Sequence, residues 1–312
     1  LGAIALTGVL DLNAAIADAN SLTVSGSTSL DADVTTSGTQ TYTSVALGTG
    51  ARTLEGSIIQ TITIDGGQNL TITGNLDSNG NIGSNTPIGV FEVSGTSNFA
   101  ANVLTSGTQT YSGAVTLGAN IVFTSSNDNF TFSSTVDSDD TTRNLTLNAG
   151  SGTIGISNAV GGGEAIGTLT ITQSGGVTFS GNINAAIVTL TDTSNSVTFA
   201  GNTVLTTLNT ASQDYNVVFT GSTNTITNAV TFSNTGYVTF GNASGDSSTF
   251  NGGLTTTAPS QVNVGGTLQT SNDAMSLGDA NTAIVLVANS VLNTGSAALT
   301  VNSTVNGGYT LT

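Results

Sequence analysis

The residues best suited to chemistry in this sequence are three aspartates in the stretch V-D-S-D-D-T-T-R-N. Asp137, Asp139 and Asp140 precede Arg143 there. Carboxylate oxygens are the ligands that Ca²⁺ prefers, and paired carboxylates can act as a general acid and base. Polysaccharide cleavage would need acids on neighbouring turns of a fold and bases to hold an anionic sugar, whereas one loop holds all three acids here. We expect a solvated loop that Arg143 partly neutralises, with a weak Ca²⁺ site at the three aspartates as the alternative and no catalytic residue.

The chain lacks the residue types that other kinds of reactive site need. The sequence contains no His and no Cys. A Ser/His/Asp or Cys/His arrangement therefore cannot be built from this chain, a zinc site is not expected, and disulfides are excluded. The stretch G-G-G-E-A-I-G also lacks the ligands of the G-G-x-G-x-D calcium repeat. We predict that the chain is not an enzyme and that it binds no cofactor, except Ca²⁺ at the weak site.

The charge of the chain limits its partners. It has 18 acidic residues against two arginines, Arg52 and Arg143, and a net charge of −16. Such a chain repels nucleic acid and anionic membrane surfaces. No run reaches the roughly 18 apolar residues that a membrane-spanning helix needs. We therefore predict neither nucleic-acid binding nor membrane insertion.

Two long internal repeats organise the sequence. Residues 22–42 align without a gap with residues 91–111, and both copies contain S-G-T-Q-T-Y. The members of a second pair, I-G-S-N-T-P-I-G and V-G-G-G-E-A-I-G, begin at Ile82 and Val160. Self-similarity at fixed offsets is typical of repeat architectures. We expect modules at approximately 22–90, 91–168 and 169–312.

A finer period predicts the fold class. Four similar stretches, V-T-F-S-G-N, V-T-F-A-G-N, V-V-F-T-G-S and V-T-F-G-N-A, begin at Val177, Val197, Val217 and Val238. Apolar and polar residues alternate within them, as in a strand with one buried face, and Gly and Asn between such runs favour turns. An antiparallel sandwich would show no fixed period of this length. We predict an all-β chain without helix: a single continuous parallel β-helix (β-solenoid) over 1–312, with about 20–25 residues per rung.

The same period predicts which residues stack. Four phenylalanines are expected above one another in the interior, and three asparagines in an amide ladder beside a glycine corner. They are Phe179, Phe199, Phe219 and Phe240, and Asn182, Asn202 and Asn242. Like charges in register would repel, which explains why charged residues are few. The last step of the period, from Val217 to Val238, is one residue longer than the two steps before it, so the corner after Phe240 is expected to be remodelled.

Three strings resemble a known kind of repeat. Residues 106–120, 132–147 and 159–171 read S-G-T-Q-T-Y-S-G-A-V-T-L-G-A-N, F-S-S-T-V-D-S-D-D-T-T-R-N-L-T-L and A-V-G-G-G-E-A-I-G-T-L-T-I. They are similar to the β-strand repeats of large bacterial surface proteins, of the filamentous-haemagglutinin-like and autotransporter-passenger types, over most of residues 22–250. The resemblance implies export, a right-handed parallel β-helix and a role in adhesion, biofilm or surface coating. It supplies no catalytic residues.

The two ends of the sequence suggest association. A solenoid exposes unpaired edges at its termini unless they are capped, and neither end here has a polar cap. Residues 1–21 are a candidate cap, donor strand or signal-peptide remnant. The residues expected to form the assembly ends are Leu1, Ile4, Leu6, Leu10, Tyr309 and Leu311. The predicted partner is the chain itself, head to tail in a filament, or further turns of a longer chain.

The function expected from these features is structural. We predict an extracellular protein at the bacterial cell surface that forms or extends a fibre, sheath or adhesin stalk by end-to-end stacking. The alternative is a carbohydrate-binding or carbohydrate-cleaving β-helix with cell-surface polysaccharide as its partner, although five Tyr and no Trp offer few rings for sugar stacking. An ice-binding solenoid is a further alternative, because Thr-x-Thr runs recur, but not in register at one coil period.

Overall fold

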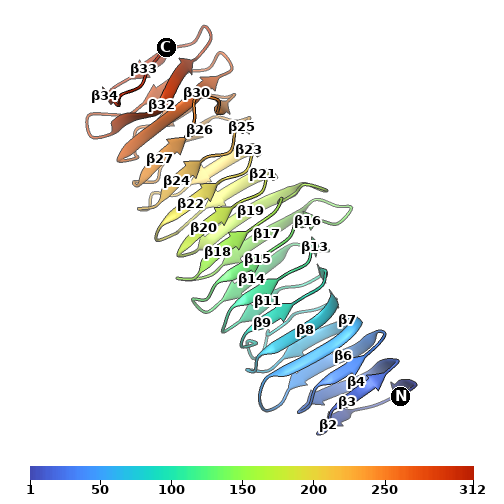
Figure 1. Ribbon diagram of the computed structural model, residues 1–312. Coiled ribbons are helices and arrows are strands. Elements are labelled where there is room, and N and C mark those ends of the chain that lie inside the picture. The colour runs from blue at the N-terminus through green and yellow to red at the C-terminus, as the bar shows by residue number, and fades with distance from the viewer. The chain divides into compact units, whose positions relative to one another are not determined.

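The chain is built from strands and turns alone. The computed structural model describes residues 1–312 and contains no helix (Figure 1). Parallel strands stack as a β-solenoid of about 15 turns with about 20 residues in each, which confirms the predicted fold class. The chain accordingly has no helix that could span a membrane.

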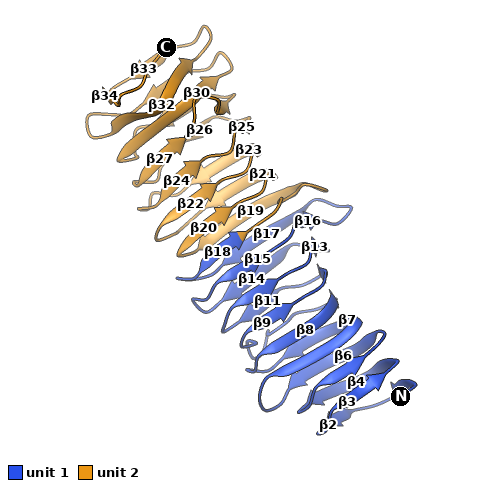
Figure 2. Cartoon of the chain, in the orientation of Figure 1, with its two compact units in different colours: residues 1–155 blue, residues 156–312 orange.

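The solenoid divides into two compact units, Leu1–Gly155 and Ile156–Thr312 (Figure 2). The division falls inside the expected module 91–168 and at the last residue of β18 (Thr153–Ile156), a strand that is described with unit 1. Each unit is described by itself below. The expectation of one continuous solenoid with the three module boundaries stays a prediction.

Unit 1 begins with a turn of three strands that lies in register on the next turn. Its strands are β1 (Ala3–Leu6), β2 (Leu10–Leu12), β3 (Ile16–Ala19), β4 (Ser21–Leu30), β5 (Val34–Thr36), β6 (Gln40–Leu47), β7 (Arg52–Asp65), β8 (Leu70–Ser78), β9 (Phe91–Val93), β10 (Ser97–Phe99), β11 (Val103–Thr105), β12 (Gln109–Tyr111), β13 (Val115–Leu117), β14 (Ile121–Ser125), β15 (Phe130–Phe132), β16 (Val136–Ser138), β17 (Arg143–Asn148) and β18 (Thr153–Ile156). Leu22 pairs with Gln40, Gln40 with Ile59, and Ile59 with Leu76. These first turns are therefore slightly shorter than the turn length expected from the later repeat.

Unit 2 contains the short repeat. Its strands are β19 (Ile166–Gln173), β20 (Gly176–Phe179), β21 (Ile183–Leu190), β22 (Ser196–Phe199), β23 (Thr203–Thr210), β24 (Asn216–Phe219), β25 (Thr223–Ile226), β26 (Val230–Thr231), β27 (Tyr237–Phe240), β28 (Ser247–Phe250), β29 (Leu254–Thr256), β30 (Gln261–Thr270), β31 (Met275–Leu277), β32 (Ala283–Asn293), β33 (Leu299–Val301) and β34 (Val305–Asn306). One ladder runs through β20, β22, β24, β27, β30 and β32, and a second sheet contains β26, β29, β31 and β33.

The alternation of apolar and polar residues determines the interior. In β20, Val177 and Phe179 are buried while Thr178 between them is exposed. Successive side chains on a strand point to opposite faces, so each V-T-F stretch directs two large apolar groups inward. The β-branched outward residue suits the extended backbone. Each turn thus contributes one layer to the apolar core of its unit.

Candidate functional site

The acidic loop after β16 is organised by its arginine. Nε and Nη2 of Arg143 donate to the two carboxylate oxygens of Asp139 at 2.8 and 2.7 Å. The backbone N–H of Thr141 donates to the same carboxylate at 3.0 Å. The Arg143 hydrogen bonds hold the pKa of Asp139 below its ordinary value; burial opposes this shift, and the Thr141 N–H bond adds to it. The expected neutralisation by Arg143 is therefore present as a bidentate ion pair.

The same loop contains the residues predicted to hold Ca²⁺. Asp137 lies on β16, in register with Thr116 of β13, while Asp139 and Asp140 follow the strand. Asp139 uses both carboxylate oxygens on Arg143. No three acidic side chains of the chain are grouped as a metal site. A weak Ca²⁺ site at Asp137, Asp139 and Asp140 stays a prediction.

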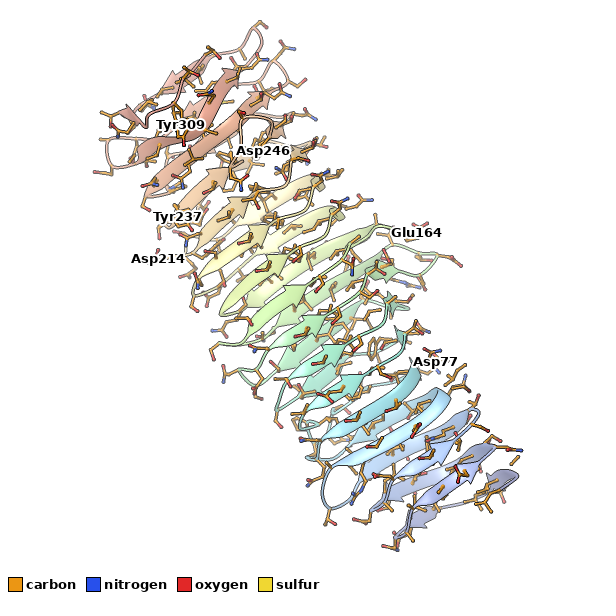
Figure 3. All side chains as sticks on the ribbon, in the orientation of Figure 1. Asp77, Glu164, Asp214, Tyr237, Asp246 and Tyr309 are labelled. Carbon is orange, nitrogen blue, oxygen red and sulfur yellow. The ribbon has the colours of Figure 1, made fainter.

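Carboxylates elsewhere in unit 1 are spaced so that they do not stack on one another. Asp77, labelled in Figure 3, lies between Gln60 and Asn98 on neighbouring turns. Its two oxygens accept hydrogen bonds from the amide of Gln60 at 3.4 Å and from that of Asn98 at 3.0 Å. An acid flanked by amide donors avoids the repulsion between like charges in register. This arrangement agrees with the reason given for the scarcity of charge.

The structure brings the four phenylalanines of the short repeat together. Phe179 pairs in register with Phe199, Phe199 with Phe219, and Phe219 with Phe240. Their ring centroids are 5.4, 4.8 and 6.2 Å apart, with interplanar angles of 17°, 9° and 13°. All four side chains are fully buried. The rings form one near-parallel column in the interior of unit 2.

The asparagines do not form the expected amide ladder. Oδ1 of Asn182 accepts from the backbone N–H of Asn202 at 2.9 Å, and Oδ1 of Asn202 accepts from that of Thr223 at 3.0 Å. Each amide thus bonds the backbone of the next turn rather than the next amide. The cause is the corner itself, where backbone N–H groups leave the strand ladder and need an acceptor.

This use of asparagine recurs through both units and was missed in the sequence. In each case Oδ1 accepts from a backbone N–H one turn further along the chain. The donor–acceptor pairs outside the short repeat include Val90 to Asn69, Thr96 to Asn75, Val122 to Asn102, Asn144 to Asn120, Thr153 to Asn129, Tyr237 to Asn216 and Thr310 to Asn289. Asn69, Asn102 and Asn120 directly precede a strand, whereas Asn75 and Asn289 lie within β8 and β32. An Asn that recurs at about one turn is the signal that predicts this bond.

The corner after Phe240 is remodelled. Gly241 has φ of +73°, a conformation that favours glycine. Asn242 is displaced from the column of Asn182 and Asn202, because its backbone N–H donates to Oδ2 of Asp246 at 2.8 Å. Ala243 donates to the same oxygen at 2.9 Å, and Figure 3 labels Asp246 at this loop. The missing residue between Phe and Gly is thus replaced by a loop that a carboxylate closes.

The long repeat contains a buried polar network. In its first copy the Tyr42 hydroxyl donates to Gln40 Oε1 at 2.8 Å, and Gln40 Nε2 donates to the carbonyl oxygen of Glu55 at 2.7 Å. Thr36 Oγ1 donates to the carbonyl oxygen of Gly38 at 2.8 Å. Because these groups are buried, each unmade hydrogen bond would cost stability.

The second copy of the long repeat forms the same network. The Tyr111 hydroxyl donates to Gln109 Oε1 at 2.8 Å, and Gln109 Nε2 donates to the carbonyl oxygen of Thr124 at 2.8 Å and to Thr105 Oγ1 at 3.0 Å. Burial raises the pKa of Tyr111 well above its ordinary value. The identical strings T-S-G-T-Q-T-Y contain the side chains of this network, yet the sequence alone suggested no role for them.

The N-terminal turn presents one edge without a strand partner. β1 and β2 both pair with β4, and β3 pairs with β5. Leu1 is 74% exposed, while Ile4, Leu6 and Leu10 are half-buried. Residues 3–19 thus pair in parallel with the next turn, and their role as a cap or donor strand stays a prediction.

The C-terminal turn leaves more apolar surface exposed. Leu299 and Val301 of β33 pair with the fully buried Met275 and Leu277, and Val305 of β34 pairs with the buried Ile284. Leu299, Val301 and Val305 are 42%, 37% and 39% exposed. Tyr309 and Leu311 are also exposed, and Figure 3 labels Tyr309 here. Interior columns therefore continue in register into β33 and β34, where these side chains are exposed.

Comparisons with known proteins give no match. No protein-family profile fits the chain, no curated protein is significantly similar to it, and no solved structure has a significantly similar fold. The resemblance to bacterial surface repeats, with the handedness, export and adhesion that it implies, therefore stays a prediction.

Proposed function

We propose that the chain is a structural protein of the bacterial cell surface, which forms or extends a fibre, sheath or adhesin stalk by stacking turn on turn. A second copy is the proposed partner, joined head to tail. The observation that carries the proposal is the parallel register of successive turns, which continues to the exposed surface of Leu299, Val301 and Val305.

A further turn is the occupant that fits this surface. The exposed side chains continue columns that are already in parallel register, so a strand of the same kind would bury them and pair the unpaired backbone edge. Covering the remaining exposed area would contribute about 1 kcal/mol for each of the three side chains. Backbone hydrogen bonds between turns would add direction and register.

The opposite surface of the contact is the N-terminal turn. Its strands β1 and β2 offer an edge without a partner, flanked by the exposed Leu1 and the half-buried Leu6 and Leu10. A contact between two different surfaces does not close on itself, so repetition gives a filament. The same surfaces would accept the neighbouring turns of a longer chain, which is the second arrangement expected from the sequence.

The net charge of the chain opposes the association and predicts how it depends on salt. Each copy carries a net charge of −16, so two copies repel at low ionic strength. Salt at about 0.5 M shortens the screening length to a few ångströms and would favour contact. We expect filament formation to increase with salt, unlike assembly through ion pairs.

Electron microscopy of the purified chain tests the proposal. We expect filaments of end-joined subunits, lengthening from low salt to about 0.5 M NaCl. Val301→Asp should shorten or abolish them, whereas the matched change Ile62→Asp, at a side chain that is 50% exposed within β7, should not. Single particles that never associate at any salt concentration, or equal inhibition by both variants, would reject end-to-end assembly.

A further inference from the structure

Two loops, one in each unit, have the same backbone geometry. They are residues 83–87 and 161–165, within the pair of similar stretches that begin at Ile82 and Val160. Gly83 has φ of +75° and Gly161 has φ of +69°. The residue before each glycine makes an isolated parallel bridge, Ile82 to Val103 and Val160 to Ile183. Glu164, labelled in Figure 3, lies on the second loop.

The hydrogen bonds at the base of the loops also match. The N–H of Ile82 donates to the carbonyl oxygen of Asn102 at 3.0 Å, and the N–H of Leu104 donates to that of Ile82 at 2.9 Å. In unit 2 the corresponding bonds, from Val160 to Asn182 and from Asn184 to Val160, are both 2.9 Å. The two loops are therefore copies of one structural element.

Each loop borders a surface hollow, and the two hollows are lined by equivalent positions. The first is about 270 Å³ and the second about 370 Å³. Three of the matched pairs are Asn102 with Asn182, Leu104 with Asn184, and Thr124 with Val204. A third hollow of about 230 Å³ shares Asn184 and Val204, so the depression in unit 2 extends further along the turns. A hollow that is repeated with its loop is a feature of the module rather than an accident of one turn.

The asparagines give each hollow an oriented hydrogen-bond donor. Oδ1 of Asn102 accepts from the backbone N–H of Val122 at 2.8 Å, and Oδ1 of Asn182 accepts from that of Asn202 at 2.9 Å. Because the backbone holds each oxygen, the orientation of the amide is fixed and its NH₂ group keeps its donors for another molecule.

The lining selects the kind of ligand. No charged side chain lines either hollow, and the walls combine amides and hydroxyls with the aliphatic groups of Leu104, Val122 and Val204. The chain's net charge of −16 repels anions, and NH₂ donors do not bind cations. A neutral molecule with many oxygens and some aliphatic surface remains, at a size of one or two sugar residues.

We propose that each hollow binds one or two residues of a neutral saccharide, so that the chain has two equivalent glycan sites. The amide NH₂ groups of Asn102 and Asn182 donate to ligand oxygens, and the aliphatic groups contact the ring face. Saccharide binding does not depend on end-to-end assembly, since the hollows lie away from the terminal turns.

Binding of neutral oligosaccharides to the full chain tests this inference. The probes are cellohexaose and chitohexaose, with polygalacturonate as an acidic comparison, measured by saturation-transfer NMR and calorimetry. We expect a Kd on the order of 1 mM for at least one neutral probe, two sites per chain, and no binding of polygalacturonate.

Substitutions separate the sites from the rest of the surface. Asn102→Asp and Asn182→Asp keep the oxygen that caps the backbone and remove the NH₂ donor, so the double variant should bind at least tenfold more weakly, and each single variant should keep one site. Asn75→Asp is the matched control, since Asn75 Oδ1 accepts from Thr96 N–H at 2.9 Å away from both hollows. Absence of binding by both neutral probes, binding of polygalacturonate alone, or an equal loss in the control would overturn the proposal.

Discussion

The interiors of the two units are filled by aromatic rings in different ways. In unit 2, Phe179, Phe199 and Phe219 lie nearly parallel, at 17° and 9°. In unit 1, Tyr111 meets the rings of Phe99 and Phe123 edge-on, at 82° and 64°, and stacks on one ring, that of its in-register neighbour Phe132, at 21°. Edge-on contacts also occur in unit 2, where Phe232 meets Phe219 and Phe240, so the difference lies in the length of the stacked column. Both arrangements are favourable for aromatic pairs, so ring chemistry alone does not explain the difference.

The lengths of the repeats explain it. The V-T-F stretches recur at one turn, so parallel register places Phe199 directly between Phe179 and Phe219. The T-S-G-T-Q-T-Y string recurs only after several turns, so the in-register neighbours of Tyr111 are Val93 and Phe132. A repeat of one turn therefore gives columns of identical side chains, whereas a longer repeat gives mixed neighbours.

The longer repeat preserves a network instead of a column. Tyr111 is bonded within its own turn to Gln109, and Gln109 reaches the next turn through the carbonyl oxygen of Thr124. Such a network needs only its own string and the backbone of the neighbouring turn, so it can be copied at any distance along the solenoid. Apolar columns thus depend on the period, whereas polar networks do not.

The largest expected loss of stability is at the glycine corner beside the phenylalanine column of unit 2. A Cβ at Gly201 would overlap the backbone carbonyl carbon and oxygen of Gly181 on the preceding turn. Backbone atoms cannot move aside, so Gly201→Val should cost above about 5 kcal/mol and prevent normal folding of unit 2. Circular dichroism and hydrogen exchange would measure the loss. Gly245→Ala, with no atom within 4 Å of the added Cβ, is the control and should fold normally.

The next effect is the removal of one ring from the column. Phe199 is fully buried between two stacked rings, so Phe199→Ala should lower the free energy of unfolding by about 3–5 kcal/mol. Phe199→Leu fills much of the same volume and should lose clearly less. Denaturant unfolding measures both, and an equal loss would show that apolar volume alone does not replace the ring in the column.

Exchanging Tyr and Phe between the two interiors tests the role of the network. Tyr111→Phe leaves Gln109 Oε1 without its 2.8 Å donor, and should cost about 1–2 kcal/mol. Phe199→Tyr places a hydroxyl within an apolar column and should cost about 1–3 kcal/mol. If either change were neutral in denaturant unfolding, the two interiors would be interchangeable and the comparison would fail.

Alkaline pH adds a second measurement for Tyr111→Phe. Burial raises the pKa of Tyr111 well above the ordinary value of 10.0. A group with a raised folded pKa contributes stability below its unfolded pKa, and the contribution is lost as the pH rises through the folded pKa. The variant should therefore lose less stability than the wild type when the pH is raised past about 10.

The sequence predicts the columns better than the corners and loops. Alternation and the regular steps of the short repeat suffice for the parallel register of Val177, Val197 and Val217, because one period governs every strand. The same period predicted the wrong partners for Asn182 and Asn202, because it relates only like side chains to one another. Corner asparagines bond backbone N–H groups, and the direction of those groups depends on local geometry that a period does not contain.

Other features could not be predicted because they join residues of different repeats. Gln40 donates to the carbonyl oxygen of Glu55, and Asp246 closes its loop onto the N–H of Asn242, through contacts that no single motif contains. The paired hollows were hidden for the same reason, since each is formed by side chains of three successive turns. The likeness of the two loop strings was visible, but the surface that they border required the register.

The smallest expected effect is on stability at low pH, to which one carboxylate in each unit contributes. Bonds from Arg143 lower the pKa of Asp139 in unit 1, while bonds from Asn281 N–H and the Thr282 hydroxyl lower that of Asp279 in unit 2. Both carboxylates stabilise the fold above their ordinary value of 3.8, and this stability is lost as the pH falls through the lowered folded pKa. Asp139→Asn and Asp279→Asn should each reduce the fall of Tm below about pH 4.

Salt distinguishes the two carboxylates. Unit 1 contains both arginines, so the Asp139 contribution is an ion pair that about 1 M NaCl should screen. The partners of Asp279 are neutral donors at 2.8–3.1 Å, and its contribution should persist in salt. Measuring Tm against pH with and without salt for both variants gives the result. Equal salt sensitivity would mean that the arginine pairing adds nothing specific, and that backbone and side-chain hydrogen bonds govern acid stability in both units.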